Sequence, residues 1–480
     1  MSGLVAPEGF DAPTVERVSP ARWRTAVQRA LEEGARPAGL HGADGEGGPE
    51  ARLLLDREGV LSLLVCPAVD GGVPTLVDLA PALNWDEREL HDVRGVRAVG
   101  HEPLRPLVDH DLDLERWTVP VHGEGPYQVA VGPIHAGVIE SGHFRFHLVG
   151  ERILHLDARL FYKHRGLERL AEGRTAADGL AVARRACAAC AVTNAVAYAQ
   201  AAESALGLWP DPMLRDVRTL LLELERLYNH LHDIGQLCAG VGFAAGAMAF
   251  AALKERAQRL NLRLAGHRFL FDSVAIGATP FRLERVDARV ARDELRALRL
   301  DARRAWRVVL FNSSVQDRLD GVGVVTREDA LRIGTVGPAG RASGVARDAR
   351  QHAPRLSYEG FVPAAPAAAN GDVQTRLELR ALELETTFDL FDALLARPLD
   401  GGTAVPAADP APLGAAVVES PRGATACVLE LADGAVRRFS LRTGSYANWP
   451  SAAFCAPGNL LPDFPLINKS FELCYACADR

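Results

Sequence analysis

The stretches RACAACAVTN (residues 185–194) and SFELCYACADR (residues 470–480) each carry a CxxC pair, although most of the chain separates them. The four cysteines are Cys187, Cys190, Cys474 and Cys477. The i, i+3 spacing within each pair places two sulfurs on one helical face or in one tight turn. The last residues of a chain usually fray, and a metal held by all four thiols would tether them. The two pairs therefore predict one shared site.

The spacing leaves the identity of the metal open. Thiolates bind soft metals such as zinc, copper(I), nickel and the iron of iron–sulfur clusters. Structural zinc, an iron–sulfur cluster and nickel are the three hypotheses that we weigh. The pairs of a zinc ribbon usually lie about 15–20 residues apart, whereas Cys190 and Cys474 lie far apart. That distance favours a site buried between two parts of one large fold.

Composition narrows the class of protein. The 480 residues are 48% hydrophobic and carry a net charge of -7, which does not favour binding to nucleic acid or to an anionic membrane surface. Residues 1–18 lack the basic start and apolar core of a signal peptide, and the most apolar run, 239–253, is shorter than the ~18 residues that a membrane span needs. We interpret that run as a buried helix. The other cysteines are predicted to be ordinary apolar residues: Cys66, Cys238, Cys427 and Cys455.

The predicted fold class is α+β, and its first domain is a small α/β unit over residues 1–120. Residues 21–35 have the apolar spacing of a helix, and residues 52–69 and 73–83 are typical of short strands. The charged segment 85–111 is expected to be irregular.

The second domain, residues 121–480, is predicted to be large and mainly helical, with small antiparallel sheets. Apolar residues at helical spacing predict long helices over 214–237, 293–312 and 371–396. Alternation over 127–161 predicts a sheet, and Ala-Asp-Gly-Ala at 432–435 predicts a hairpin turn. Residues 397–414 have the composition of a Pro/Ala/Gly linker that need not be ordered, and residues 444–473 are expected to be irregular.

A family resemblance now adds to these patterns. From Gly132 to Arg480 the chain resembles the large subunit of [NiFe] hydrogenases, in particular the membrane-associated formate-hydrogenlyase (energy-converting) type, which is related to the quinone-site subunit of respiratory complex I. The N-terminal segment 85–107 resembles the 30-kDa hydrophilic subunit of complex I. The matching stretches are GPIHAGVIESGHFRF, FYKHRGLERLAE, RACAAC, AVAYAQAAESALG, RASGVARDAR, GDVQTRLELRALE, VVESPRG, GSYANWP, GNLLPDFPLINKSF and CYACADR.

The resemblance implies a nickel–iron centre with carbon monoxide and cyanide ligands on the iron, at which dihydrogen is cleaved heterolytically or formed from protons. Carried over by position, Cys187 and Cys474 are terminal nickel ligands, and Cys190 and Cys477 bridge the two metals. Cys474 is then also the thiolate that accepts the proton, because a thiolate bound to a divalent metal is a proton acceptor near neutral pH.

Three further residues match functional positions of the family, and each also has a plainer interpretation. Glu140 matches a carboxylate that relays the proton, a role that needs a raised pKa; otherwise it is a solvated loop residue. Arg422 matches an arginine suspended over the metals; otherwise it lies on the surface. Glu168 matches a glutamate near a second, magnesium-like site; otherwise it is an exposed helix charge.

Two departures from the family pattern concern the surroundings of the thiols. Asn194 stands where the family has a histidine after the first pair, and Glu472 and Leu473 stand where Asp-Pro usually precedes the second. All four cysteines are nevertheless intact. The alternative function is therefore a complex I-like NADH:quinone oxidoreductase subunit with an altered or absent metal, or a structural subunit whose thiols hold zinc.

The resemblance also implies partners. Electrons must leave a buried centre, so a small subunit with a [4Fe–4S] cluster is expected, together with ferredoxin-like electron-transfer subunits and membrane subunits of a complex I-like assembly. The chain is expected on the cytoplasmic face of the membrane, attached through those subunits. Dihydrogen and protons are the expected substrates.

Overall fold

The N-terminal unit is built on a four-stranded sheet of order β1-β4-β3-β2, in which β1 runs parallel to β4 and the other neighbours are antiparallel. The computed structural model describes residues 12–110, 117–135 and 139–480, so residues 1–11, on which the expected lack of a signal peptide partly rests, lie outside it. The elements of this unit are β1 (Thr14–Arg17), α1 (Pro20–Glu32), β2 (Arg36–Gly45), β3 (Gly48–Arg57), β4 (Val60–Pro67), β5 (Gly72–Pro74), η1 (Pro81–Leu83), α2 (Asn84–Arg94) and β6 (Arg97–Val99). Trp23 and Val27 of α1 are buried in the core of this unit.

Two expectations for this unit are wrong. Residues 73–83 form only the short strand β5 and the 3₁₀ turn η1, and the charged segment that we expected to be irregular begins with helix α2. The apolar pattern of the sequence does not reveal α2, because the buried face of this helix includes carboxylates. Asp86 accepts a hydrogen bond from the backbone N–H of Leu40 (3.1 Å), and Glu87 accepts one from the hydroxyl of Thr75 (2.6 Å).

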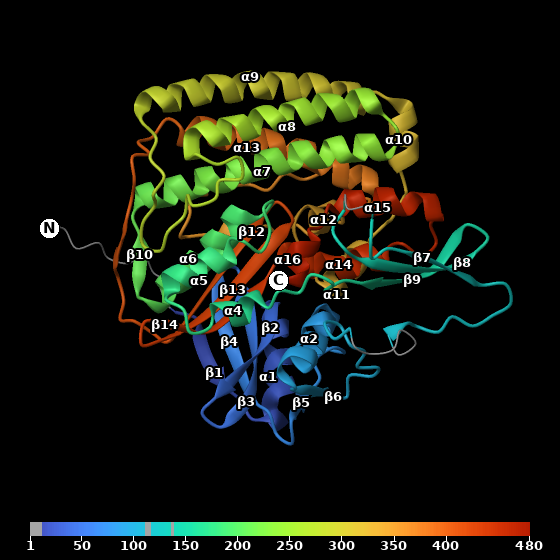
Figure 1. Cartoon of the computed structure of the whole chain (residues 1–480), viewed down its shortest axis with the longest axis vertical. Helices are drawn as coiled ribbons and strands as arrows, with labels where there is room; N and C mark the ends of the chain where they lie inside the picture. Colours follow the sequence, from blue (N-terminus) through green and yellow to red (C-terminus); the bar gives the residue numbers. More distant parts are fainter. Residues whose placement is uncertain (1–11, 111–116, 136–138) are drawn as a thin grey trace.

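The large unit places long helices on one side of small sheets, as Figure 1 shows with α7, α8, α9 and α13 stacked at the top. Its helices are α4 (Leu167–Ala171), α5 (Ala176–Ala183), α6 (Ala191–Ala205), α7 (Pro212–Gly240), α8 (Ala244–Ala265), α9 (Arg285–Leu310), α10 (Ser313–Leu319), α11 (Arg327–Ile333), α12 (Gly337–Ala342), η2 (Ala349–His352), α13 (Val373–Leu394), α14 (Gly444–Phe454), η3 (Leu461–Asp463), α15 (Phe464–Phe471) and α16 (Tyr475–Asp479). Its strands are β7 (Tyr127–Val131), β8 (His143–Val149), β9 (Arg152–Arg159), β10 (Leu208–Pro210), β11 (Ala404–Pro406), β12 (Leu413–Ser420), β13 (Gly423–Ala432) and β14 (Ala435–Arg442). The expected α+β class is confirmed.

The long helices and the sheets lie where periodicity predicts them. Strands β7, β8 and β9 form an antiparallel sheet, and Ala432 pairs with Ala435 at the predicted hairpin turn between β13 and β14. The linker 397–414 is instead integrated into the fold, because β11 within it pairs with β10. The expectation for 444–473 is wrong, since α14 and α15 occupy most of that segment. The division at residue 120 stays a prediction.

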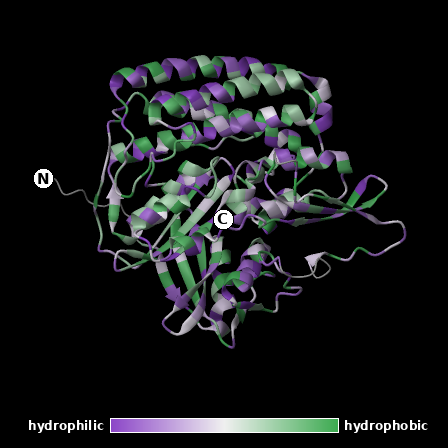
Figure 2. Cartoon of the chain, in the orientation of Figure 1, coloured by the Kyte–Doolittle hydropathy of each residue, from purple (hydrophilic) through white to green (hydrophobic). Residues whose placement is uncertain are grey.

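Hydrophobic side chains distinguish the buried elements of the fold from its outer helices. Hydrophobic residues run along the strands of the N-terminal sheet, whereas α9 alternates hydrophobic and hydrophilic residues as an outer helix does (Figure 2). Helix α6, which follows the first CxxC pair, packs on β12 and β13. No helix in the described ranges is long and apolar enough to cross a membrane.

Candidate metal centre

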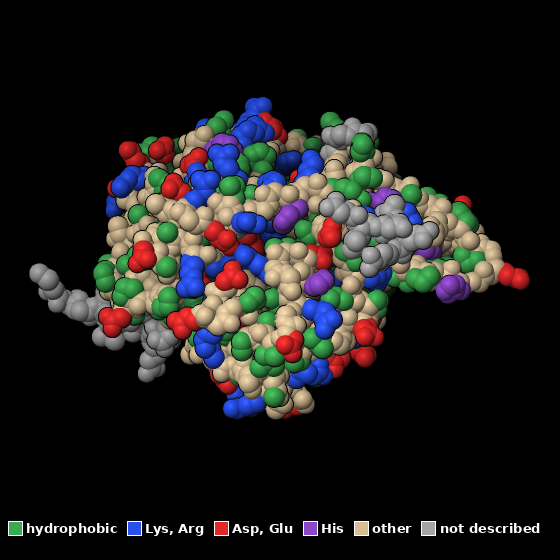
Figure 3. Space-filling view, turned by 60° about the horizontal axis from the view of Figure 1, so that its bottom comes forward, with side chains coloured by type: hydrophobic (Ala, Val, Ile, Leu, Met, Phe, Trp, Pro, Cys, Tyr) green, Lys and Arg blue, Asp and Glu red, His purple; other side chains and the backbone are tan. Residues whose placement is uncertain are grey.

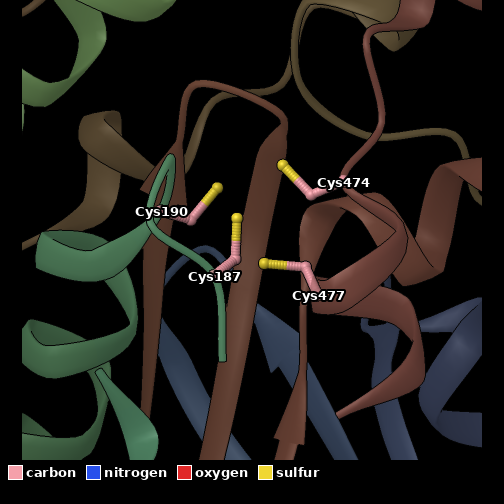
Figure 4. Close-up of side chains that lie close together, drawn as sticks. All are labelled: Cys187, Cys190, Cys474 and Cys477. Atoms are coloured by element: carbon pink, nitrogen blue, oxygen red, sulfur yellow. The ribbon is translucent and has the colours of Figure 1, made fainter. Parts of the chain in front are cut away.

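The two CxxC pairs meet in space. The four sulfur atoms lie within 4.8 Å of one another, and Figure 4 shows them pointing toward a common point from two separate segments. All four are free thiols; Cys190 and Cys477 are buried, whereas Cys187 and Cys474 are partly exposed. In the part of the chain that the structure describes, this is the one group of His, Cys, Asp and Glu side chains with metal-ligand geometry.

Helix starts and hydroxyl groups fix the cysteines. Cys190 is the N-cap residue of α6, and Cys474 is the N-cap residue of α16. The backbone N–H of Cys474 donates to the hydroxyl of Ser445 (3.0 Å), and the hydroxyl of Thr443 donates to the carbonyl of Cys477 (2.9 Å). The helix α14 that sequence patterning missed therefore supports the second pair.

The loop of the first pair is held by α7 and by one arginine. The Tyr228 hydroxyl donates to the carbonyls of Ala188 (3.2 Å) and Ala189 (3.3 Å). The guanidinium of Arg165 donates to the carbonyl of Ala186 (2.8 Å) before the first pair and to that of Ala476 (3.1 Å) within the second. Arg165 thus ties the two CxxC segments together without using a sulfur atom.

The thiols of the cluster differ in their pKa values, so negative charge is stable on one sulfur in preference to others. Hydrogen bonds from the thiols of Cys187, Cys190 and Cys477 lower the pKa of Cys474 well below its ordinary value, and the nearby charge of Arg422 acts in the same direction. Contacts with Cys187 and Cys474 raise the pKa of both Cys190 and Cys477; Cys477 raises that of Cys190 further, whereas Cys190 acts to lower that of Cys477. One thiolate is therefore stable in the cluster, whereas several crowded thiolates would repel one another unless a cation lies between them.

Arg422 is buried beside this cluster, at 3% exposure, and is no surface residue. Its guanidinium donates to both carboxylate oxygens of Asp233 on α7, with 2.9 Å between Nη2 and Oδ1, and to the side-chain oxygen of Asn229 (3.1 Å). Asp233 also accepts from Arg380 (2.9 Å). The charge of Asp233 and then that of Cys474 raise the pKa of Arg422 despite burial, so the arginine stays cationic at the sulfurs.

Glu140 reaches the second CxxC pair from the loop between β7 and β8. Its carboxylate accepts a hydrogen bond from the backbone N–H of Ala476 (2.8 Å), between Cys474 and Cys477. The side chain is otherwise exposed in this chain taken alone, so the partial burial expected for a relay carboxylate is not seen.

Glu168 is surrounded by guanidinium groups. One carboxylate oxygen accepts from the backbone N–H of Leu441 (2.8 Å) and from Arg480 (3.2 Å), and the other accepts from Arg438 (3.2 Å). Because cations already occupy both oxygens, these surroundings do not fit a magnesium ion, which needs several oxygen ligands. Glu168 is thus an anchor for the Arg480 side chain.

Sequence reasoning missed the contacts that only the fold creates. The Asn194 amide, at the position where we noted a missing histidine, donates to the sulfur of Cys477 at 3.9 Å. Asp233 was not singled out, although Arg226, Asn229 and Asp233 recur at helical spacing on α7 and are all buried. Polar residues at the spacing of an apolar stripe are the signal that would have found them.

The site agrees in its chemistry with a nickel–iron centre. Four sulfurs from two CxxC pairs are a soft donor set, the buried cation of Arg422 lies beside them, and the sulfur of Cys477 has a hydrogen-bond donor in Asn194. Four sulfur donors suit a divalent zinc ion equally well. The class of protein therefore follows from comparison with known proteins.

Three protein families match consecutive parts of the chain. Residues 46–122 match the 30 Kd subunit and residues 240–411 the 49 Kd subunit of respiratory-chain NADH dehydrogenase, and residues 165–261 match nickel-dependent hydrogenase. The matched regions define an oxidoreductase subunit of the hydrogenase and complex I class.

Individual relatives narrow the class further. The chain is 31% identical to formate hydrogenlyase subunit 5 of Escherichia coli (strain K12) over 85% of this chain and 77% of the relative, and 30% identical to hydrogenase-4 component G of the same organism over 85% and 76%. A subunit of the membrane-bound sulfane sulfur reductase, an archaeal respiratory membrane complex, shares the fold with a TM-score of 0.67 and 26% identity, over 75% of this chain and 100% of that chain. The chain belongs to the family of energy-converting [NiFe] hydrogenase large subunits of the formate-hydrogenlyase type.

Proposed function

We propose that Cys187, Cys190, Cys474 and Cys477 hold a nickel–iron centre with carbon monoxide and cyanide on the iron, in the catalytic large subunit of a hydrogenase complex. The convergence of four sulfurs within 4.8 Å, from two segments that lie far apart in the sequence, carries the proposal. When bound, such a centre supplies heterolytic cleavage of dihydrogen or its formation from protons. Cys187 and Cys474 would hold the nickel, and Cys190 and Cys477 would hold both metals.

The protein contributes a proton acceptor at Cys474. Its thiol is the member of the cluster with the lowered pKa, and Cys474 as a residue is partly exposed. Glu140 is held on the same turn by the Ala476 N–H, so its carboxylate takes the proton from Cys474 and releases it outward. Exposure of Glu140 supports this outward direction, because a proton on its carboxylate exchanges directly with solvent.

Arg422 contributes fixed positive charge. Because Asp233 and Asn229 orient its guanidinium before reaction, no reorganisation is needed when negative charge develops at the sulfurs. Arginine suits this position because its planar group keeps its charge when buried and donates in several directions at once. Arg422 therefore stabilises the deprotonated state of Cys474.

Electrons pass, in this proposal, to a small subunit with a [4Fe–4S] cluster and then to ferredoxin-like subunits. The relatives support such an assembly, since the archaeal neighbour is part of a respiratory membrane complex. The chain is accordingly assigned to the cytoplasmic face of the membrane, held there by partners. The match to the 49 Kd subunit favours quinone reduction as the second candidate function, but the intact four-cysteine cluster favours the hydrogenase reaction.

Substitution of one cysteine tests the assignment. Cys474→Ser in the complex purified from its own host is expected to abolish hydrogen-dependent dye reduction and nickel retention, because a terminal ligand and proton acceptor is lost. Cys238→Ser is the matched control, since Cys238 is a buried cysteine of α7 outside the cluster. Equal effects of the two substitutions would contradict the assignment.

A further inference from the structure

Helix α2 joins the hydrophobic cores of the two units. Its Leu90 is buried in the core of the N-terminal unit, whereas its Trp85 is buried in the core of the large unit. The ring of Trp85 lies edge-on to the ring of Tyr446 on α14, with 5.6 Å between the centroids. The same helix α14 supports the second CxxC pair through the hydrogen bond from Cys474 to Ser445. The N-terminal unit therefore packs directly on an element that positions the metal centre.

Ion pairs fix α2 on the large unit beside this aromatic contact. Figure 3 shows acidic and basic side chains next to one another across the middle of the molecule. Three side chains of α2 are paired with residues of the large unit: Asp86 with Arg442 (2.9 Å), Arg94 with Glu172 (2.7 Å) and Glu89 with Arg480 (2.5 Å). Separation of a largely buried pair leaves a charge without its partner, which is costly. The pairs therefore hold α2 in one orientation against the large unit.

Arg480 connects α2 to the second CxxC pair. It is the C-cap residue of α16, the helix of one turn that contains Cys477. Its backbone N–H donates to the carbonyl of Ala476 (3.1 Å), and its guanidinium donates to Glu168 (3.2 Å) as well as to Glu89. So short a helix is not stable by its own hydrogen bonds. Its orientation, and with it the direction of the Cys477 sulfur, therefore depends on contacts of this kind.

Water cannot readily replace the carboxylate of Glu89. The cavity beside Arg480 has a volume of about 30 Å³, which is room for a water molecule but not for the hydration of a cation. Glu168 is shared, because it also pairs with Arg438 (3.2 Å). Although burial by itself lowers it, the charges of Glu89 and Glu168 raise the pKa of Arg480 above its ordinary value. Loss of Glu89 would leave this buried cation poorly compensated, so Arg480 would move toward solvent and take α16 with it.

We propose that Glu89 is a positioning residue for the second CxxC pair, and that the N-terminal unit thereby keeps the four-sulfur site assembled. The inference rests on the proposed function and adds a conformational control of the same site. Glu89 acts through Arg480, which fixes the orientation of α16. A change that lifts α2 from the large unit loosens Cys477, so the seating of the N-terminal unit controls how firmly the metals are held.

The variant Glu89→Gln tests the proposal in the complex purified from its own host, because it keeps the size of the side chain and removes its charge. Backbone hydrogen exchange of residues 474–480 is expected to become about tenfold faster, the factor that corresponds to ~1.4 kcal/mol. Nickel release to a chelator is expected to accelerate as well. The matched control is Glu33→Gln, at an exposed carboxylate of the same unit that pairs with Arg57. Unchanged exchange or unchanged nickel release in the Glu89 variant would overturn the proposal.

The same exchange experiment separates positioning from general stabilisation. Residues 53–65, which include the end of β3 and most of β4, are expected to exchange as in wild type in the Glu89 variant. Acceleration there to the same extent as in residues 474–480 would overturn the proposal, since Glu89 would then merely stabilise the N-terminal unit.

A double variant tests whether Glu89 acts through Arg480. Glu89→Gln together with Arg480→Gln removes the poorly compensated cation along with its partner. The effect of Glu89→Gln on exchange should therefore be smaller in the Arg480→Gln background than in wild type, whereas additive effects would overturn the proposal. Absence of nickel from the wild-type complex would contradict the proposed function instead. Hydrogen exchange needs no metal and still tests the positioning role, so the two failures are distinguishable.

Discussion

Asp233 on α7 accepts a hydrogen bond at each carboxylate oxygen from the guanidinium of Arg422, which lies in the turn between β12 and β13. The pair is fully buried, and Asp233 is held in turn by Arg380. An unpaired charge in such a place costs several kcal/mol, so the pair keeps the guanidinium in one orientation beside the sulfurs. The charge that the proposed mechanism needs is therefore part of the folded structure before any substrate arrives.

Arg422→Lys keeps the positive charge but loses the planar fork that contacts Asp233 and Asn229. We expect hydrogen turnover to fall by about 10²-fold, in line with the loss of one preorganised donor, while nickel content stays at the wild-type level. The measurement is turnover per nickel. Arg437→Lys, at a half-exposed arginine of β14, is the control. Wild-type turnover in the Arg422 variant would show that the guanidinium has no part in the reaction.

Glu140→Gln preserves an oxygen that can accept from the Ala476 N–H but removes the site that holds a proton. Turnover is expected to fall by about 10²–10⁴-fold, the usual contribution of a positioned proton-transfer group. Exchange of deuterium gas with solvent protons should slow to the same extent, with nickel unchanged. Glu151→Gln, at the exposed turn between β8 and β9, is the control. If exchange stays fast, the proton leaves by another route.

Asn194→Ala removes the hydrogen bond to the sulfur of Cys477. A donor at a thiolate stabilises its negative charge and hence the reduced metal, so its loss is expected to move the midpoint potential of the nickel signal to more negative values. A redox titration followed by electron paramagnetic resonance measures this shift. Ser204→Ala on the same helix should leave the potential unchanged. An unmoved potential in the Asn194 variant would make this contact a packing contact alone.

Glu225 predicts a dependence of stability on pH. Burial raises its pKa to about 7, although the backbone N–H groups of Val192 (2.7 Å) and Thr193 (3.1 Å) donate to it. In the unfolded chain a glutamate has a pKa of about 4.3, so between about pH 4.3 and pH 7 the folded state binds more protons. Stability from this group therefore falls as the pH rises through that window. The melting temperature of wild type should decline there more steeply than that of Glu225→Gln, and parallel curves would refute the assignment.

The sequence predicted the elements whose burial follows a simple apolar period. Helices α7, α9 and α13 and the β13–β14 hairpin are of this kind. Helix α2 was missed because ion pairs and hydrogen bonds, rather than apolar contacts, stabilise part of its buried face. Asp86, for example, is paired with Arg442 of β14 (2.9 Å), a residue hundreds of positions away. No local pattern reports such a partner.

The residues of the candidate site also fall into two groups, those that the sequence predicts and those that only the fold reveals. The cysteines are found from their spacing, because CxxC is a local motif, and the family resemblance supplies Arg422 and Glu140 as candidates. Residues that act through distant contacts are not found in that way: Asp233 becomes visible only once α7 packs against the turn that carries Arg422, and Arg165 only once both CxxC segments are placed. For Glu168 the sequence suggests a role that the fold does not favour. It matches a metal-site position of the family, but its carboxylate is paired with the guanidinium groups of Arg438 and Arg480.

Metal analysis of the complex purified from its own host tests the central claim most directly. The account predicts one nickel per chain, with one iron in addition to the iron of the partner clusters, and loss of the nickel in Cys474→Ser. Zinc as the sole metal at the four sulfurs would contradict it and make the cluster a structural clamp. Absence of any metal would also contradict it, in favour of the quinone-linked function of the complex I relatives.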